Sequence, residues 1–172
     1  FDLGNSPREF TRERVCGKAI VMSTTNGTRA LRACAGAAAT LLGSWLNLEA
    51  NARWIADQSP PDLLLVCSGT LDQTALEDVL AAGALCARLQ GLYPDSLPAD
   101  SAEIARLFYG ACENDTAGVM QHSRNARRLL AMPDLRDDVA VCMQRDAVHF
   151  VAGLSGDGWI RRIGNIRVRL TN

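Results

Sequence analysis

A run of hydroxyl, amide and guanidinium side chains, Thr24-Thr25-Asn26-Gly27-Thr28-Arg29, lies between an apolar segment and an amphipathic one. A strand followed by a helix would place this run at the carboxyl end of the strand, where α/β folds bind ligands. Backbone N–H groups at a helix N-terminus attract anions, and an arginine fork binds two oxygens at once. The run also suits a plain Asn-Gly turn followed by a threonine helix cap. As an anion site, it makes Arg29 a substrate-binding and catalytic candidate.

A second donor run, Ser68-Gly69-Thr70, follows the apolar segment 62–67 and is expected to open onto the same sheet edge. Glu77 and Asp78 come one turn into the next expected helix. Mg²⁺ prefers hard oxygen ligands and needs only one or two carboxylates beside phosphate oxygens, so both residues are candidate magnesium ligands. The alternative is that these acids, like others in a first turn, simply favour the helix dipole. Adjacent carboxylates on a helix point about 100° apart, so at most one is expected to face a cleft.

The stretch His122 to Arg128 concentrates one histidine and three arginines. Arg124 and Arg128 are four residues apart and therefore share a helix face. They are candidates for further anion clamps, Arg124 in substrate binding and Arg128 in catalysis. A solvated basic face is the alternative. Arginine dominates the basic residues as a whole, because Lys18 is the single lysine of the chain.

Sequence signatures of covalent hydrolysis are absent from the chain. It has no cysteine followed by arginine at the spacing of thiol phosphatases, no D-x-D-x-[TV] loop, no G-x-S-x-G elbow and no Walker A run. Any phosphoryl chemistry would therefore depend on positioning and charge neutralisation rather than on one of these nucleophiles.

Alternating apolar and amphipathic segments predict the elements that position these residues. Strands are expected at 18–23, 38–43, 62–67, 139–144, 148–154 and 159–163, and helices at 28–34, 45–57, 74–89, 100–114 and 117–131. This order predicts an α/β fold, layered α/β/α, with a mixed β-sheet and a C-terminal β-hairpin turning at 155–158. One domain is expected to span residues 1–172.

Composition narrows the class of protein further. The net charge of −1 argues against nucleic-acid binding, and no apolar run approaches the length of a membrane span. Six widely spaced cysteines without a C-x-x-C pair argue against structural zinc and indicate reduced thiols in a cytoplasmic protein. Cys67, Cys86 and Cys142 lie in apolar runs, so we expect them to be buried and unbridged.

Several runs, in order along nearly the whole chain, resemble the 2-phosphosulfolactate phosphatases. They are Gly4-Asn5-Ser6-Pro7, Gly17-Lys18, Ser23 to Leu31, Gly43 to Asn47, Val66 to Thr70, Leu76 to Gly83, Ser123 to Leu129 and Asp138 to Cys142. The combination of T-T-N-G-T-R with L-E-D-x-L-x-A-G is the most specific part. Family chains carry a further N-terminal segment, with an Asp…Arg-Ala-x-x-Thr stretch, that this sequence lacks.

The resemblance implies Mg²⁺-dependent hydrolysis of the phosphate ester of 2-phosphosulfolactate, which gives sulfolactate and phosphate on the way to coenzyme M. The expected partner is therefore a small phosphorylated and sulfonated anion, with no nucleic acid and no membrane; a homo-oligomer is left open. Arg29, Glu77 and Arg128 are the catalytic candidates, and Glu77 and Asp78 the metal candidates. The substrate-binding candidates are Thr24, Thr25, Asn26, Gly27, Thr28, Ser68, Gly69, Thr70 and Arg124. The competing hypothesis is a non-catalytic binder or sensor of small sulfonate or phosphate anions.

Overall fold

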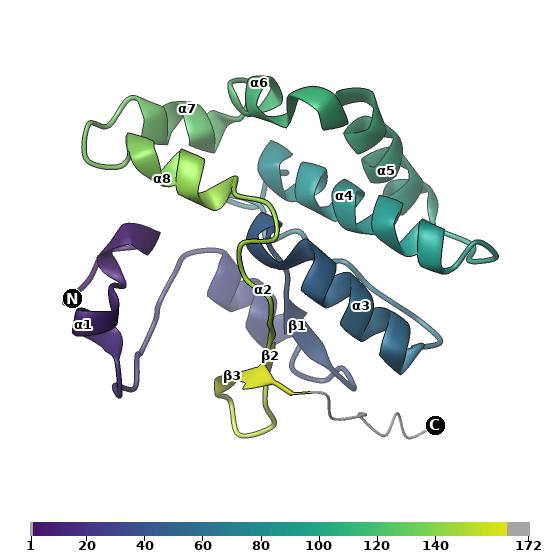
Figure 1. The fold of residues 1–172 in the computed structure, drawn as a ribbon, viewed down its shortest axis with the longest axis horizontal. Coiled ribbons are helices and arrows are strands. Elements are labelled where there is room, and N and C mark those ends of the chain that lie inside the picture. Colours follow the sequence, from purple (N-terminus) through teal and green to yellow (C-terminus); the bar gives the residue numbers. More distant parts are fainter. Residues whose placement is uncertain (1, 165–172) are drawn as a thin grey trace.

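The computed structural model describes residues 2–164, in which a small sheet lies at the lower edge of the view and the helices α4 to α8 lie above it (Figure 1). The α-helices are α1 (Arg12–Val15), α2 (Gly27–Ala33), α3 (Leu48–Gln58), α4 (Leu76–Leu92), α5 (Asp100–Cys112), α6 (Thr116–Met120), α7 (Arg124–Leu130) and α8 (Arg136–Cys142). Short 3₁₀ turns, η1 (Pro7–Glu9), η2 (Trp45–Asn47) and η3 (Glu113–Asp115), join some of them. The strands are β1 (Thr40–Leu42), β2 (Val151–Leu154) and β3 (Ile160–Ile163).

The sheet has the order β1-β2-β3, with Thr40 opposite Leu154 and Val151 opposite Ile163. Strands β2 and β3 form a hairpin, in which Ser155 N–H donates to the Trp159 carbonyl at 2.8 Å. The α/β class and the C-terminal hairpin are thus confirmed. The expectation of a mixed sheet was wrong for the described residues, because both strand pairings among them are antiparallel.

The core lies between α3, α4 and α5, where Leu80 and Ala84 are fully buried. Helices α4 and α5 approach each other closely at Gly83, because a side chain there would overlap the Ala105 carbonyl oxygen. Ser44 and Asn47 form a capping box before α3, which fixes where that helix starts. The expected helices at 28–34, 45–57, 74–89 and 100–114 are confirmed, with η2 taking the first turn of the second.

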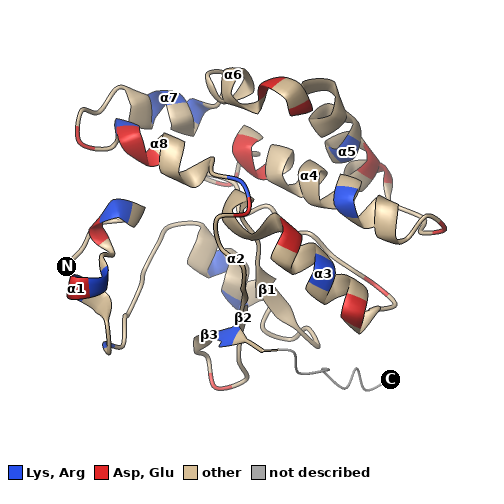
Figure 2. Cartoon of the chain, in the orientation of Figure 1, with Lys and Arg blue, Asp and Glu red and all other residues tan. Residues whose placement is uncertain are grey.

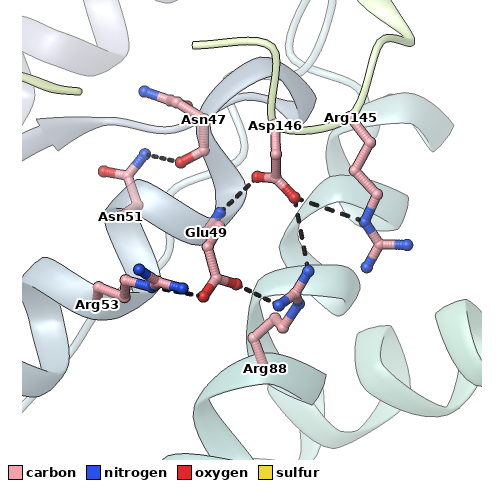
Figure 3. Close-up of polar contacts among 7 residues, drawn as sticks. All are labelled: Asn47, Glu49, Asn51, Arg53, Arg88, Arg145 and Asp146. Carbon is pink, nitrogen blue, oxygen red and sulfur yellow. Dashed lines mark hydrogen bonds and ion pairs between the residues drawn. The ribbon is translucent and has the colours of Figure 1, made fainter. Parts of the chain in front are cut away.

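A network of charged side chains joins α3 and α4 to the turn before β2 (Figure 3). Glu49 accepts hydrogen bonds from Arg53 Nε at 2.7 Å and from Arg88. Asp146 accepts from the Glu49 backbone N–H at 2.6 Å and lies 3.5 Å from Arg88 Nη2. Hydrogen bonds from arginine, Arg53 first, hold the pKa of Glu49 below its ordinary value. The network ties the helical layer to the sheet.

Two apolar runs predicted as strands, 18–23 and 62–67, are extended but form no ladder within residues 2–164. A strand needs a neighbouring backbone to satisfy its N–H and C=O groups, and neither run meets one there. Their apolar side chains are correspondingly exposed: Val21 is 94% and Leu64 is 82% accessible. The prediction of buried sheet strands at these positions was therefore wrong for the described chain.

Two further expectations fail for local reasons. The run 139–144, predicted as a strand, instead contains the end of α8, which continues to Cys142, because Asp137 and Asp138 supply a favourable acidic first turn. The helix expected over 117–131 is split into α6 and α7, since Ser123 takes an extended backbone and caps α7.

All six cysteines are free, which confirms the expected absence of bridges. The expected burial was wrong for Cys67 and Cys142, which are exposed, while Cys86 is partly buried. Cys67 ends the unpaired run 62–67, so no sheet covers it. Among the described residues, every helix is too short or too polar to cross a membrane.

Candidate functional site

A cavity of about 530 Å³ lies where three loops meet the starts of α2, α4 and α7. The loops come from the N-terminal segment, from the run before α2 and from the run before α4. Acidic residues begin α4 and basic residues follow along α7 (Figure 2). The lining residues are Asn5, Thr24, Thr25, Asn26, Gly27, Ser68, Gly69, Thr70, Leu71, Glu77, Asp78, Asn125 and Arg128.

The threonine loop before α2 is held by hydrogen bonds within itself. Thr28 N–H donates to Thr24 Oγ1 at 3.1 Å, and Thr28 Oγ1 donates to the Thr24 carbonyl at 2.7 Å. Asn26 Oδ1 accepts a 3.3 Å hydrogen bond from Leu71 N–H, which joins this loop to the serine loop before α4. Two donor runs predicted separately from the sequence therefore line one cavity.

Asp78 holds the serine loop, Ser68-Gly69-Thr70, by two hydrogen bonds. Its Oδ2 accepts from Gly69 N–H at 2.8 Å and from Ser68 Oγ at 3.3 Å. Gly69 has a φ of 65°, and a Cβ there would lie 2.5 Å from the Gln73 carbonyl oxygen, so glycine alone fits without strain. Desolvation and the neighbouring Glu77 raise the pKa of Asp78 despite these hydrogen bonds.

Glu77 has a different set of partners, although it is the adjacent residue. Ser123 Oγ donates to Glu77 Oε2 at 2.7 Å, and Asn125 Nδ2 donates to Oε1. Desolvation raises the pKa of Glu77, but the hydrogen bonds from Ser123, Asn125 and its own backbone, together with the charge of Arg124, outweigh it and leave the pKa below its ordinary value. Glu77 is thus held as a carboxylate. Both acids line the cavity, whereas the helical spacing predicted that at most one would face it.

The structure places the three arginine candidates, Arg29, Arg124 and Arg128, in different surroundings. Arg128 lines the cavity and forms no ion pair with the described residues. Arg124 donates to Gln73 Oε1 at 2.6 Å and to the Thr70 carbonyl at 3.3 Å, which positions the serine loop. It borders a smaller cavity of about 230 Å³ beside His122. Arg29 lies outside the wall of both cavities; its side chain is 70% exposed and pairs with Asp72 at 3.6 Å.

Sequence reasoning missed Asn5, Leu71 and Asn125 as lining residues, and Ser123 as the partner of Glu77. Ser123 and Asn125 had a detectable signal, since a serine cap and an amide begin the same helix as Arg124. Asn5 belongs to the run Gly4-Asn5-Ser6-Pro7 that carries the family resemblance, but its spacing alone does not connect it to loops more than fifteen residues away.

The donor set suits a magnesium ion that is completed by substrate and water. Glu77 and Asp78 are the two carboxylates of the cavity wall, and Asp78 Oδ1 accepts no hydrogen bond from the described residues. Residues 2–164 contain no cluster of three or more His, Cys, Asp or Glu side chains that could hold a metal alone. One or two carboxylates with phosphate oxygens are what Mg²⁺ commonly uses, so the residues fit the ion.

A model of a protein family described as 2-phosphosulpholactate phosphatase matches residues 1–157. The chain belongs to this family. A relative from Caldanaerobacter subterraneus, named as a probable 2-phosphosulfolactate phosphatase, is 37% identical over 154 residues, which are 90% of this chain and 63% of that protein. Relatives of the same name from Thermotoga petrophila and Thermotoga maritima are 38% and 36% identical, covering 85% and 90% of this chain and 61% and 64% of their own lengths.

The chain therefore spans less than two thirds of the length of these phosphatase-family relatives. The family match nevertheless contains every residue that lines the main cavity, from Asn5 to Arg128. The wall of loops and carboxylates described above thus lies wholly within the part that the family shares.

Proposed function

We propose that the protein is a Mg²⁺-dependent phosphatase that hydrolyses the phosphate ester of 2-phosphosulfolactate, or of a similar phosphorylated hydroxy acid, to sulfolactate and phosphate. The observation that carries the proposal is the cavity in which two donor loops and Arg128 face Glu77 and Asp78. The names of the relatives support the substrate class. In this role the reaction is a step towards coenzyme M in the cytoplasm.

The loops supply the donors that an anionic ester needs. Thr24, Thr25, Ser68 and Thr70 bring hydroxyls to the wall, and the turn at Gly69 brings backbone groups. Arg128 adds a positive charge that no described acid neutralises. Phosphoryl transfer has a transition state whose charge is spread over the oxygens, so such positioned donors lower its barrier.

The two carboxylates are the residues that would hold the metal. Glu77 is fixed by Ser123 and Asn125, and Asp78 keeps one oxygen without a hydrogen bond. Mg²⁺, when bound, neutralises charge on the phosphoryl oxygens. In the proposed reaction the oxygen of water bonds to phosphorus and the bond from phosphorus to the ester oxygen breaks; one proton of water goes to the ester oxygen, which becomes the hydroxyl of sulfolactate, and the other stays on phosphate.

Cys67, which precedes the serine loop, does not supply a nucleophile in this scheme. Desolvation and the Asp78 carboxylate raise the pKa of its thiol, so the thiolate is disfavoured at neutral pH. Direct attack by water therefore suits the site better than a covalent intermediate.

Phosphate release from 2-phosphosulfolactate and from 2-phospho-hydroxy acids without a sulfonate, measured with Mg²⁺ and with excess EDTA, tests the proposal. We expect release that depends on the metal and is fastest with the sulfonated ester. Full activity in EDTA would contradict the metal requirement. Binding of sulfolactate without any phosphate release would instead favour the second candidate, a sensor of small anions, which the open wall of donors also permits.

A further inference from the structure

We infer that Asn5 is a substrate-binding residue and that a clasp closed by Asp138 holds it in the cavity wall. The inference rests on the proposed function of the cavity, and it adds a residue from the far N-terminal end of the chain to that site. It assigns recognition of the substrate's oxygens to a neutral amide that lines the same cavity as the donor loops and Arg128.

The clasp consists of Ser6 and Arg8, near the start of the chain, and of Asp138, which lies 132 and 130 residues further along the sequence. Ser6 Oγ donates to Asp138 Oδ1 at 2.8 Å, and Arg8 Nε donates to the same oxygen at 2.6 Å. Arg8 also donates to the Asp134 carbonyl and lies 3.6 Å from Asp137 Oδ2. Asp138 and Ser6 are buried, whereas the Arg8 side chain is 40% exposed, so the clasp is packed on the Ser6 side and partly solvated on the Arg8 side.

The clasp immobilises the chain on one side of Asn5, and a second contact does so on the other. Ser6 is buried next to it, and Pro7 at the start of η1 fixes the following backbone angle. Gly4 N–H donates to Glu9 Oε2 at 2.9 Å, which closes the loop upon itself. Asn5 is therefore presented from a rigid loop, as a ligand-binding group requires.

The side chain of Asn5 is uncommitted within residues 2–164. Asn26, in the same wall, accepts a hydrogen bond at Oδ1 from Leu71 N–H, and Asn125 Nδ2 donates to Thr70 Oγ1 and Glu77 Oε1. Asn5 is exposed and its side chain makes no hydrogen bond with the described residues, so its NH₂ donors and its carbonyl acceptor are available to a ligand in the cavity. A loop fixed on both sides around a free amide is the arrangement expected of a recognition residue.

An amide at this place suits a ligand with several oxygens. Its NH₂ group can donate to a phosphate, sulfonate or carboxylate oxygen, and its carbonyl can accept from a hydroxyl. The amide forms directional hydrogen bonds and carries no charge. It therefore selects for the position of the ligand's oxygens more than it raises the overall affinity for anions.

The first test replaces Asn5 by aspartate, which has the same shape but puts a negative charge and no donor in the wall. For phosphate release by the full-length protein we expect the KM of Asn5→Asp to rise about tenfold or more, since like charges repel in the site. The matched control is Asn114→Asp in η3, an exposed asparagine remote from the cavity wall, which should leave KM unchanged. Equal KM values for the wild type and Asn5→Asp would overturn the inference.

A second measurement does not depend on turnover. The side-chain amide signals of Asn5, assigned in a ¹⁵N NMR spectrum by their loss in Asn5→Ala, should move when inorganic phosphate or sulfolactate is titrated. Signals that stay fixed while other cavity residues respond would contradict the assignment. Moving signals in a protein that releases no phosphate would uphold Asn5 as an anion contact and refute the phosphatase proposal.

The role of the clasp is tested by a double-mutant cycle of Asn5→Ala with Asp138→Asn. If Asp138 acts through Asn5, the double variant should lose no more substrate affinity than Asn5→Ala alone. Losses that multiply would show that Asp138 does not act by positioning Asn5. If Asp138→Asn fails to fold, Ser6→Ala takes its place in the cycle. That variant removes the hydrogen bond from Ser6 to Asp138 and keeps the hydrogen bond from Arg8.

Discussion

The hydroxyl of Ser123 lies 2.7 Å from Glu77 Oε2 and joins the start of α7 to the start of α4 across 46 residues of sequence. Ser123 is completely buried and also accepts a 3.1 Å hydrogen bond from Ala126 N–H as the cap of α7. One oxygen atom therefore fixes both a helix terminus and a carboxylate of the cavity. The same contact explains why the helix expected over 117–131 breaks where it does.

Removing that hydroxyl is expected to destabilise the fold. Ser123→Ala loses a helix cap and a hydrogen bond to a charged group, which together should lower the free energy of unfolding by about 2–3 kcal/mol. Urea denaturation followed by circular dichroism measures the change. Ser101→Ala, on the exposed face of α5, is the control and should have little effect. Equal midpoints for the two variants would show that the Ser123 contact contributes nothing.

The close approach of α4 and α5 gives a second prediction. Gly83→Ala would place a methyl group against the Ala105 carbonyl, a backbone atom that cannot turn away. We expect a loss of about 1–3 kcal/mol in unfolding free energy from this overpacking. Gly110→Ala in α5 meets no atom within 4 Å and should be neutral or stabilising by up to about 1 kcal/mol. A stable Gly83→Ala variant would mean that the helices can separate at little cost.

The clasp at Asp138 should make stability depend on pH. The Arg8 hydrogen bond holds the pKa of Asp138 below its ordinary value of 3.8. A lowered pKa means that the stabilisation is present in full above pH 3.8 and is lost as the pH falls through the folded-state pKa. The stability difference between the wild type and Asp138→Asn, measured by urea denaturation, should therefore persist at pH 7 and shrink below pH 3.8. A difference that grew on acidification would contradict this sign.

The sequence predicted the helices better than the strands, and the reason is physical. Helix α4 satisfies its own backbone, so the period of its apolar residues and its acidic first turn sufficed to place it. The apolar runs 18–23 and 62–67 have the pattern of strands, but whether they join a sheet depends on a second strand beside them, which the pattern does not identify. The apolar residues from Val139 to Cys142 fit the period of a strand and the period of a helix equally well. The acidic residues before them favour the helix, and the run ends α8.

In the candidate site, too, local motifs were predictive and long-range contacts were not. The threonine and serine loops were predicted from strand ends, Glu77 and Asp78 from a helix first turn, and Arg128 from a helix face, and the structure brings them together in one cavity. Asn5 and Ser123 could not be placed, because their roles arise from contacts with Asp138 and Glu77 over long sequence separations. Local spacing also could not show which of Arg29 and Arg128 lines the cavity, because each lies in a helix that follows a polar turn.

Arg128 and Arg29 offer the sharpest test of the site. The motif alone made Arg29 the expected anion contact, but its exposed side chain pairs with Asp72 outside the cavity wall. Arg128 lines the cavity and has no acidic partner within residues 2–164. Loss of a charge-assisted contact to a phosphoryl oxygen should cost about 2–4 kcal/mol of transition-state stabilisation, or about 30- to 1000-fold in kcat/KM for Arg128→Ala. Arg128→Lys should also be impaired, because it keeps the charge but loses the fork.

Exposed ion pairs contribute well under about 1 kcal/mol, so Arg29→Ala should change kcat/KM by less than about threefold. Arg127→Ala is the matched control, since Arg127 is adjacent to Arg128 but donates to the His122 carbonyl away from the cavity. The kcat/KM values of the three alanine variants, measured on correctly folded full-length protein, decide the matter. A large loss for Arg29→Ala with none for Arg128→Ala would mean that the substrate lies over α2, and that the cavity between the loops is not where phosphate is released.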